Sequence, residues 1–283
     1  MPGVTTPDPA PQPLATYEDL GYRDVFWATR NYEDACDRIA LRALLPRGGD
    51  LIEIGAGFGR LSDEYGAFER VVLLDSSAVH TTAAVEALRD DLRIEVRLGD
   101  ALALPFSDGE FDVAVCVRVL HHFADPGPLI AEIGRVVRPG GVLVIEYANK
   151  RNLKSIARRL LGRQAWSPFS LGSAQYKAHH YDHAPVSVRR ALRAAGFSIE
   201  RTRTASLFRL PGLTRRFSPA LLARIEGPLQ GPLGGATPGP SVFVQARRTA
   251  QGSIQRSRAV ARHSDASRWR STRSFDPSGE SGS

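Results

Sequence analysis

Short apolar runs alternate along the first half of the chain with segments whose apolar residues recur at helical spacing. The apolar runs cover residues 50–54, 71–75, 93–98, 111–117 and 141–147, and the helical segments cover residues 60–65, 78–89 and 128–137. Short runs rich in Val, Ile and Leu are typical of strands, and their alternation with helices is typical of βαβ units. Their near-continuous apolar character indicates strands buried on both faces of a parallel sheet. We therefore expect an α/β fold.

The pattern differs on either side of this region. Residues 17–45 show helical spacing, and residues 151–184 interrupt the alternation with an amphipathic helix over 153–161 and a loop-like stretch. A helix over 185–195 and strands over 197–207 and 241–247 then follow. The Pro-rich start and the Ser/Arg-rich end contain too few apolar residues to form a core. We expect a disordered leader (1–13), one domain (14–247) with a variable basic insertion (151–184), and a disordered tail (248–283).

Composition supports a folded intracellular domain. Hydrophobic residues make up 42% of the 283 residues, which is enough for a sizeable core. Cys36 and Cys116 form neither a disulfide framework nor a metal-binding spacing, and Cys116 lies in an apolar run, so we expect a buried free thiol. No stretch approaches the roughly 20 apolar residues of a membrane span, and the start lacks the apolar region of a secretory signal. We expect a cytoplasmic location, with peripheral membrane attachment left open.

Positive charge gathers in the second half of the chain. The net charge is +7, and residues 151–216 contain fourteen Lys and Arg against only Asp182 and Glu200. Such asymmetry indicates an anionic partner, either a phosphate-bearing substrate, an anionic membrane surface or nucleic acid, or simply a solvated basic face. The helix over 153–161 either lies on an anionic membrane or packs on the domain. We do not expect nucleic acid, because no basic module interleaved with aromatic residues is visible.

A glycine-rich loop follows the first strand. Gly55, Gly57 and Gly59 follow Glu53 at intervals of two, and glycine allows a sharp turn and a close approach of the backbone to a ligand. Asp75 ends the next strand, where an acidic side chain meets the ribose of an adenosine group or caps the following helix. A nicotinamide-dependent oxidoreductase would carry G-x-G-x-x-G. Here the third glycine comes one residue early, which argues against that class.

Further segments belong to the same pattern as the glycine-rich loop and Asp75. They are Gly99-Asp100-Ala101, Arg118-Val119-Leu120-His121-His122 and Arg138-Pro139-Gly140-Gly141. In order and spacing, the motifs of residues 50–147 resemble those of class I S-adenosylmethionine (SAM) dependent methyltransferases, in particular the type 11 family. The resemblance implies a Rossmann-like, mostly parallel seven-stranded sheet of order 3-2-1-4-5-7-6, with an antiparallel last strand and helices on both faces. It also implies that SAM is the cofactor. The cofactor contacts that it implies are Glu53, Gly55, Ala56, Gly57, Gly59, Asp75, Ser76, Asp100, Ala101 and Arg118.

The resemblance implies methyl transfer by in-line displacement to a small-molecule or lipid-like acceptor. A general base is optional in this chemistry, and His121, His122 and Glu146 lie where one would be expected. The two histidines either act as bases or shape the pocket. Trp27 and Tyr32 either cover the cofactor or belong to the core. The cluster of His179, His180, Tyr181 and His183 either covers the substrate or invites a metal site, but its spacing fits no common zinc pattern, so we expect no metal. The acceptor, the methylated atom and the oligomeric state are not predicted.

Overall fold

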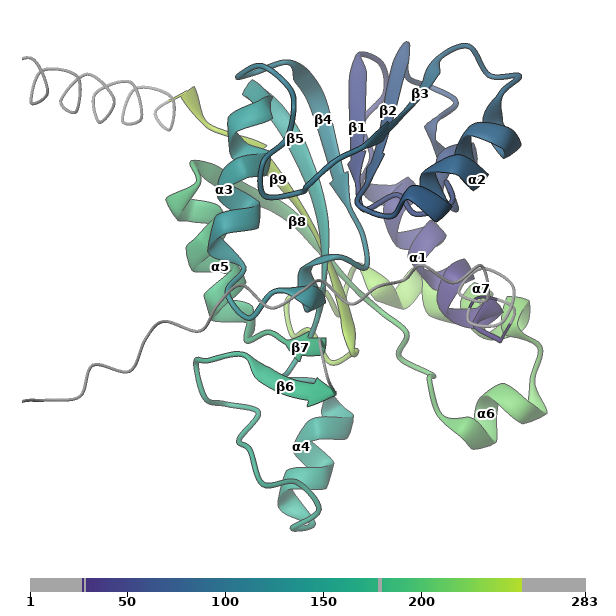
Figure 1. The fold of residues 1–283 in the computed structure, drawn as a ribbon. Helices are drawn as coiled ribbons and strands as arrows, with labels where there is room; N and C mark the ends of the chain where they lie inside the picture. The colour runs from purple at the N-terminus through teal and green to yellow at the C-terminus, as the bar shows by residue number, and fades with distance from the viewer. Residues whose placement is uncertain (1–26, 28, 178–179, 251–283) are drawn as a thin grey trace, which may run out of the picture.

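The protein is described by a computed structural model that covers residues 27, 29–177 and 180–250. Its central feature is a seven-stranded sheet of order β3-β2-β1-β4-β5-β9-β8 (Figure 1). The strands are β1 (Asp50–Ile54), β2 (Arg70–Asp75), β3 (Ile94–Leu98), β4 (Phe111–Cys116), β5 (Val137–Ala148), β8 (Phe197–Ala205) and β9 (Ser241–Arg248). The first five are parallel, and β9 is antiparallel to both of its neighbours. This confirms the predicted sheet order, with β8 and β9 as sixth and seventh strands.

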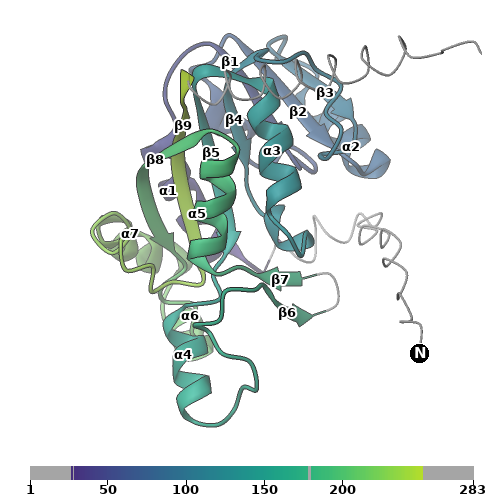
Figure 2. The same cartoon turned by 90° about the vertical axis from the view of Figure 1, so that its left-hand side faces the viewer.

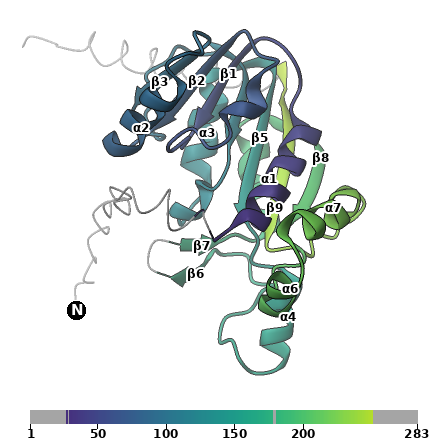
Figure 3. The same ribbon diagram turned by 90° about the vertical axis from the view of Figure 1, so that its right-hand side faces the viewer.

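Helices cover both faces of the sheet. On one face lie α3 (Gly127–Val136) and α5 (Pro185–Ala194) (Figure 2). On the other lies α1 (Asn31–Leu44), and α7 (Pro219–Gln230) packs against it (Figure 3). Neighbouring strand residues point to opposite faces, so Leu51 joins the core beneath α1 and Ile52 joins the core beneath α3 and α5. Burial on both faces explains the unbroken apolar runs.

Element ends differ from the expected ones by a few residues. Helix α2 (Ala78–Leu88) begins at Ser77, whose hydroxyl accepts a hydrogen bond from His80 N. Strand β5 begins four residues before the expected strand, at a shift in its register with β4. The helix expected over 60–65 is a short 3₁₀ turn, Ser62–Tyr65. In the segment expected over 17–45, α1 begins only at Asn31, and residues 17–26 lie outside the described part.

Two features were not expected. Within residues 151–184, α4 (Leu153–Leu160) is followed by a small hairpin of β6 (Ala174–Lys177) and β7 (His180–Asp182). Between β8 and β9 lie α6 (Pro211–Arg216) and α7. Helix α7 contains Pro228, and its buried stripe includes Glu226 and Gln230, so its hydrophobic pattern is weak. Glu226 accepts hydrogen bonds from Ser206 N, Leu207 N and the Tyr32 hydroxyl, which satisfies its burial.

The structure describes only part of the segments expected on either side of the domain. The predicted leader 1–13 lies outside the described residues, as do residues 251–283 of the predicted tail. Arg248, which was assigned to that tail, belongs to β9 instead, and its guanidinium donates to the Arg135 and Val137 carbonyls. Among the helices in the described ranges, none has the length and apolar character needed to cross a membrane. Cys116 is a buried free thiol, as expected.

Candidate active site

A pocket of about 230 Å³ lies at the carboxyl ends of β1 to β4. Strands of a parallel sheet end at one edge, so the loops that follow them meet there. Nine of the ten expected cofactor contacts line this pocket: Glu53, Gly55, Ala56, Gly57, Asp75, Ser76, Asp100, Ala101 and Arg118. Trp27, Phe58, Arg60, His80, Val119, His122 and Phe123 also line it. The fold therefore brings together residues as far apart in the sequence as Trp27 and Phe123.

The glycine loop contains three residues in the left-handed region. Gly55 has φ +73°, and a Cβ added there would lie 2.1 Å from Val119 Cγ2. Gly57 has φ +58° and borders open space, so its backbone is accessible from the pocket. Gly59 (φ +79°) is not among the lining residues, and a Cβ there would lie 2.8 Å from Leu88 Cδ1. This differs from the expected cofactor contact: Gly59 serves the packing of the loop against α2.

Glu53 ends in the pocket although it is only 2% exposed. Burial raises the pKa of its carboxyl to about 7. The Tyr65 hydroxyl lies beside this carboxyl and partly offsets the rise in its pKa, but among the described residues no donor meets Oε2 with full hydrogen-bond geometry. A buried oxygen without a donor is costly, so Glu53 is suited to receive a cationic or hydrogen-bonding ligand group.

Asp75 organises the loop from the end of β2. Its Oδ2 accepts a hydrogen bond from Gly57 N (2.7 Å), and its Oδ1 accepts one from Ser77 N (2.9 Å). Ser77, and not Asp75, is the N-cap of α2. The neighbouring Asp100 follows β3 and turns its own loop by accepting from Leu102 N (2.8 Å). The two carboxylates therefore face the same pocket from adjacent strands.

Arg118 connects the pocket to α1. Its backbone is left-handed (φ 62°), and its guanidinium makes a two-pronged contact with the fully buried Asp37 through Nε (3.1 Å) and Nη2 (2.8 Å). Arg60 also donates to Asp37 (3.4 Å) and lies 3.8 Å from the Trp27 ring centre. Trp27 thus forms part of the pocket wall, whereas Tyr32 is buried in the core. Sequence inspection missed Asp37, because a single Asp on a helix carries no distinguishing pattern.

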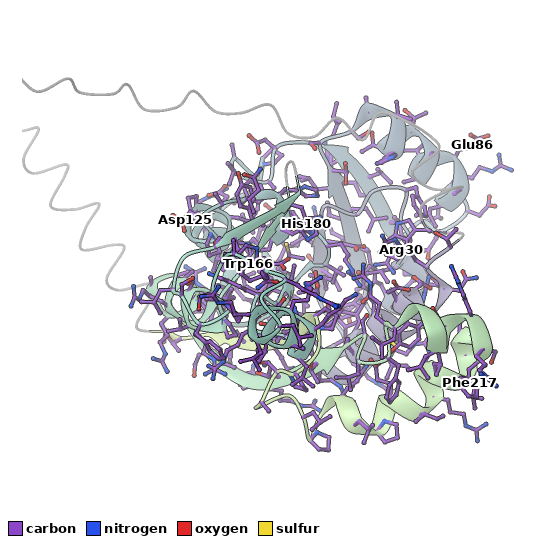
Figure 4. The ribbon with its side chains drawn as sticks, turned by 90° about the horizontal axis from the view of Figure 1, so that it is seen from below. Arg30, Glu86, Asp125, Trp166, His180 and Phe217 are labelled. Carbon is purple, nitrogen blue, oxygen red and sulfur yellow. The ribbon has the colours of Figure 1, made fainter. Side chains whose placement is uncertain are left out.

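The histidines lie at the far end of the pocket. His122 lines it, while His121 packs between His122 (ring centres 4.0 Å apart) and His180 of β7 (4.4 Å; His180 is labelled in Figure 4), with the rings tilted. Burial and the neighbouring histidines lower the pKa of His121 well below its ordinary value, so this imidazole is neutral at pH 7. His183 Nε2 donates to the Leu120 carbonyl (3.0 Å) and ties β7 to this wall. Among the described residues no metal-binding group occurs, and His179 lies outside them.

Glu146 lies behind the pocket and not in its wall. It is 1% exposed, its Oε1 accepts from the Ser241 hydroxyl (2.6 Å), and its Oε2 accepts from Arg118 N (3.1 Å). This placement differs from the expected catalytic position, because side chains alternate along β5 and this one points under the Arg118 turn. Glu146 is placed to hold Arg118 in its left-handed conformation.

Comparison with known proteins agrees with this geometry. A family model described as a methyltransferase domain matches residues 52–145. The chain is 30% identical over 212 residues to the 27-O-demethylrifamycin SV methyltransferase of Amycolatopsis mediterranei, with 69% of this chain and 71% of that protein covered. It is 33% identical to the 2-methyl-6-phytyl-1,4-hydroquinone methyltransferase of a Synechocystis strain, with 40% of this chain but only 36% of that protein covered.

The fold is shared with solved structures. A SAM-dependent methyltransferase of Thermotoga maritima, described as a possible histamine N-methyltransferase, superposes with a TM-score of 0.58 at 20% identity, covering 81% of this chain and 94% of that one. At this identity the likeness concerns the fold alone. The family is shown by the rifamycin-type relative, at 30% identity over more than two thirds of both chains, and by the methyltransferase-domain match. The chain belongs to the class I SAM-dependent methyltransferases.

Proposed function

We propose that the protein transfers a methyl group from SAM to a small-molecule or lipid-like acceptor by in-line displacement. The observation that carries this proposal is the pocket itself, which has two chemically different ends. Asp75 and Asp100 line it from the ends of β2 and β3 on one side, His122 and Phe123 line it from the loop after β4 on the other, and Glu53 of β1 lies between them in the strand order. Such a pocket suits a polar cofactor at one end and an apolar or aromatic acceptor at the other.

The residues present fit SAM. Gly57 leaves room for close approach, and the buried Glu53 Oε2 can receive the methionine ammonium directly or through water. Asp75 would hold the ribose hydroxyls, Asp100 the adenine amine, and Ala56, Ser76 and Ala101 the surrounding surface. SAM supplies an electrophilic methyl group on a sulfonium when it is bound. The protein's part in such a reaction is to orient the two reactants in a dry site.

At the acceptor end we assign His122 to the pocket wall, where it can shape the cavity or accept a proton from a hydroxyl acceptor. His121 supports His122 by packing against it with the two rings tilted. Glu146 acts through the Arg118 turn, so it is a positioning residue. The two relatives support an acceptor that is largely apolar and carries oxygen functions, because their names specify a rifamycin lacking its 27-O-methyl group and a phytyl hydroquinone.

A labelled-methyl assay tests the proposal. The full chain is incubated with methyl-labelled SAM and a panel of hydroquinones and other hydroxylated apolar compounds, and products are identified by mass spectrometry. We expect label in an extractable small molecule, and His122→Ala is expected to reduce turnover while SAM affinity stays within about threefold. Label only in protein or nucleic acid would contradict the proposed acceptor class.

A further inference from the structure

Two helical segments project from the edge of the sheet that holds the pocket. Strands β5 and β8 run in the same direction, so both end at this edge. Helix α4 follows β5 after Ala148, and α6 follows β8 after Ala205. Figures 1 and 3 show both helices at the lower end of the molecule. Figure 4 looks onto this end and labels Trp166, which follows α4, and Phe217, which follows α6.

Large apolar side chains of these segments face solvent. On and after α4, Leu153 is 63% exposed, Leu160 82% and Leu161 67%. The only buried residue of α4 is Ser155, so the helix does not bury its leucines against the domain. Phe169 and Leu171 in the loop after α4, and Leu210 and Phe217 beside α6, are also exposed. Clustered exposed apolar residues indicate an interaction site.

The loop that carries Phe169 is fastened to the domain. Lys150, at the end of β5, is 2% exposed, and its ammonium donates to the carbonyls of Gly172 (2.6 Å) and Ser170 (3.2 Å). The Arg151 guanidinium lies 5.3 Å from the Phe169 ring centre. Helix α4 itself begins at Asn152, whose side chain accepts from Ser155 N (2.9 Å). The start of α4 and the loop that carries Phe169 are therefore tied to the domain by these contacts.

The charge around these residues has one sign. Residues 151–181 contain six Lys and Arg and no Asp or Glu, and the same is true of residues 201–225. Lys154, Arg159 and Arg163 in the first segment are exposed, as are Arg215 and Arg216 in the second. Basic side chains beside protruding leucines match a surface that offers negative charge outside and hydrocarbon beneath.

We propose that α4, the loop to Leu171 and α6 form a docking surface for a membrane that contains anionic lipids. The exposed leucines favour a lipid surface over nucleic acid, because phosphate contacts require Lys and Arg but gain nothing from Leu160 or Leu161. Docking would turn the pocket edge of the sheet toward the bilayer. The proposal does not depend on which acceptor the enzyme methylates.

Vesicle co-sedimentation of the full chain tests whether the basic residues of this surface contribute to membrane binding. We expect binding to vesicles with about 30% phosphatidylglycerol, weaker binding in high salt, and none to pure phosphatidylcholine. The triple variant Lys154→Glu, Arg159→Glu, Arg163→Glu should bind at least about 100-fold more weakly, since each basic residue near the surface contributes about 1 kcal/mol. The matched control reverses Arg47 before β1, Arg89 at the end of α2 and Arg193 near the end of α5, which are exposed at the opposite edge of the sheet. It should retain binding, and equal loss in both variants would overturn the proposal.

A second pair of variants tests the apolar contact. Leu160→Ser with Leu161→Ser should weaken binding to anionic vesicles by about tenfold or more. Leu92→Ser, at a 97% exposed position before β3, should not. Calorimetric SAM binding checks that every variant is folded. If RNA competes fully with vesicles and the leucine variants bind vesicles like wild type, the surface is a nucleic-acid site and the membrane proposal is wrong.

Discussion

Replacing Glu53 by Gln removes the only ionisable group whose pKa the pocket raises close to neutrality among the described residues. The buried carboxyl of the free protein has a pKa of about 7, so about half of the molecules carry the proton at pH 7. A cationic ammonium favours the ionised form. SAM binding should therefore require the ionised form of Glu53. Bound SAM should in turn lower the pKa of this carboxyl group.

The expected size follows from the competent fraction. With a pKa of about 7, the ionised fraction is about one half at pH 7 and about one tenth at pH 6, so the apparent Kd should rise about fivefold over this unit. Isothermal titration calorimetry at both pH values, in buffers of different ionisation enthalpy, measures the affinity and the proton released. Glu53→Gln should bind more weakly at pH 7 and show a much smaller change with pH.

The same group affects stability with a definite sign. Its pKa is raised above that of an unfolded Glu, about 4.5, so the folded protein holds the proton more tightly. The protonated carboxyl adds to the free energy of unfolding, and this stabilisation is fully present below pH 4.5. It is lost as the pH rises through 7, and the whole difference is about 3 kcal/mol. Glu53→Gln should remove this loss. A wild-type Kd that is flat from pH 6 to 7, or a Gln variant with the same pH slope, would refute the reasoning.

Two further substitutions test the frame of the pocket. Gly55→Ala should destabilise the fold by about 2 kcal/mol or more in chemical denaturation, because the backbone is left-handed and the new Cβ meets Val119, whereas Gly140→Ala (φ +83°, open space) should cost less. Equal costs would exclude the contact with Val119. Asp37→Asn should cost about 2 kcal/mol and weaken SAM binding, because it leaves the partly buried Arg118 without its carboxylate. Thermal melting with and without SAM checks this, and an unchanged melting temperature would show that Arg118 is held by other contacts.

The parallel sheet was predictable because its signal is local. Strands β1, β2 and β4 and the second half of β5 are compact apolar runs, whereas the edge strand β3 alternates with Glu95 and Arg97 and is only partly buried. The glycine loop directly follows β1, and Asp75 ends β2. The meeting of Glu53, Asp75 and Asp100 in one pocket then follows from parallel topology. The left-handed turn at Arg118 was not predictable, since it depends on Asp37 and Glu146, which lie 81 and 28 residues away.

Helix α7 shows a second reason why part of the fold was not predictable from the sequence. Its buried face includes Glu226 and Gln230, and these are acceptable only because Ser206, Leu207 and Cys36 supply the matching backbone groups. A periodicity analysis assigns such residues to the surface. The position of Glu146 behind the pocket was hidden from the sequence for a related reason: its chemical type indicates catalysis, but its place on β5 aims its carboxylate at Ser241.

Calorimetric titration of SAM into the wild-type chain and into Asp75→Ala tests whether the pocket at the ends of β1 to β4 is the cofactor site. Asp75 is expected to hold the ribose hydroxyls, and hydrogen bonds to a charged group contribute about 1.5–3 kcal/mol each. The wild type should bind SAM, and the variant should bind at least about 100-fold more weakly while still unfolding cooperatively, with some stability lost because Gly57 N and Ser77 N lose their acceptor. Unchanged SAM affinity in a folded Asp75→Ala variant would show that the cofactor binds elsewhere.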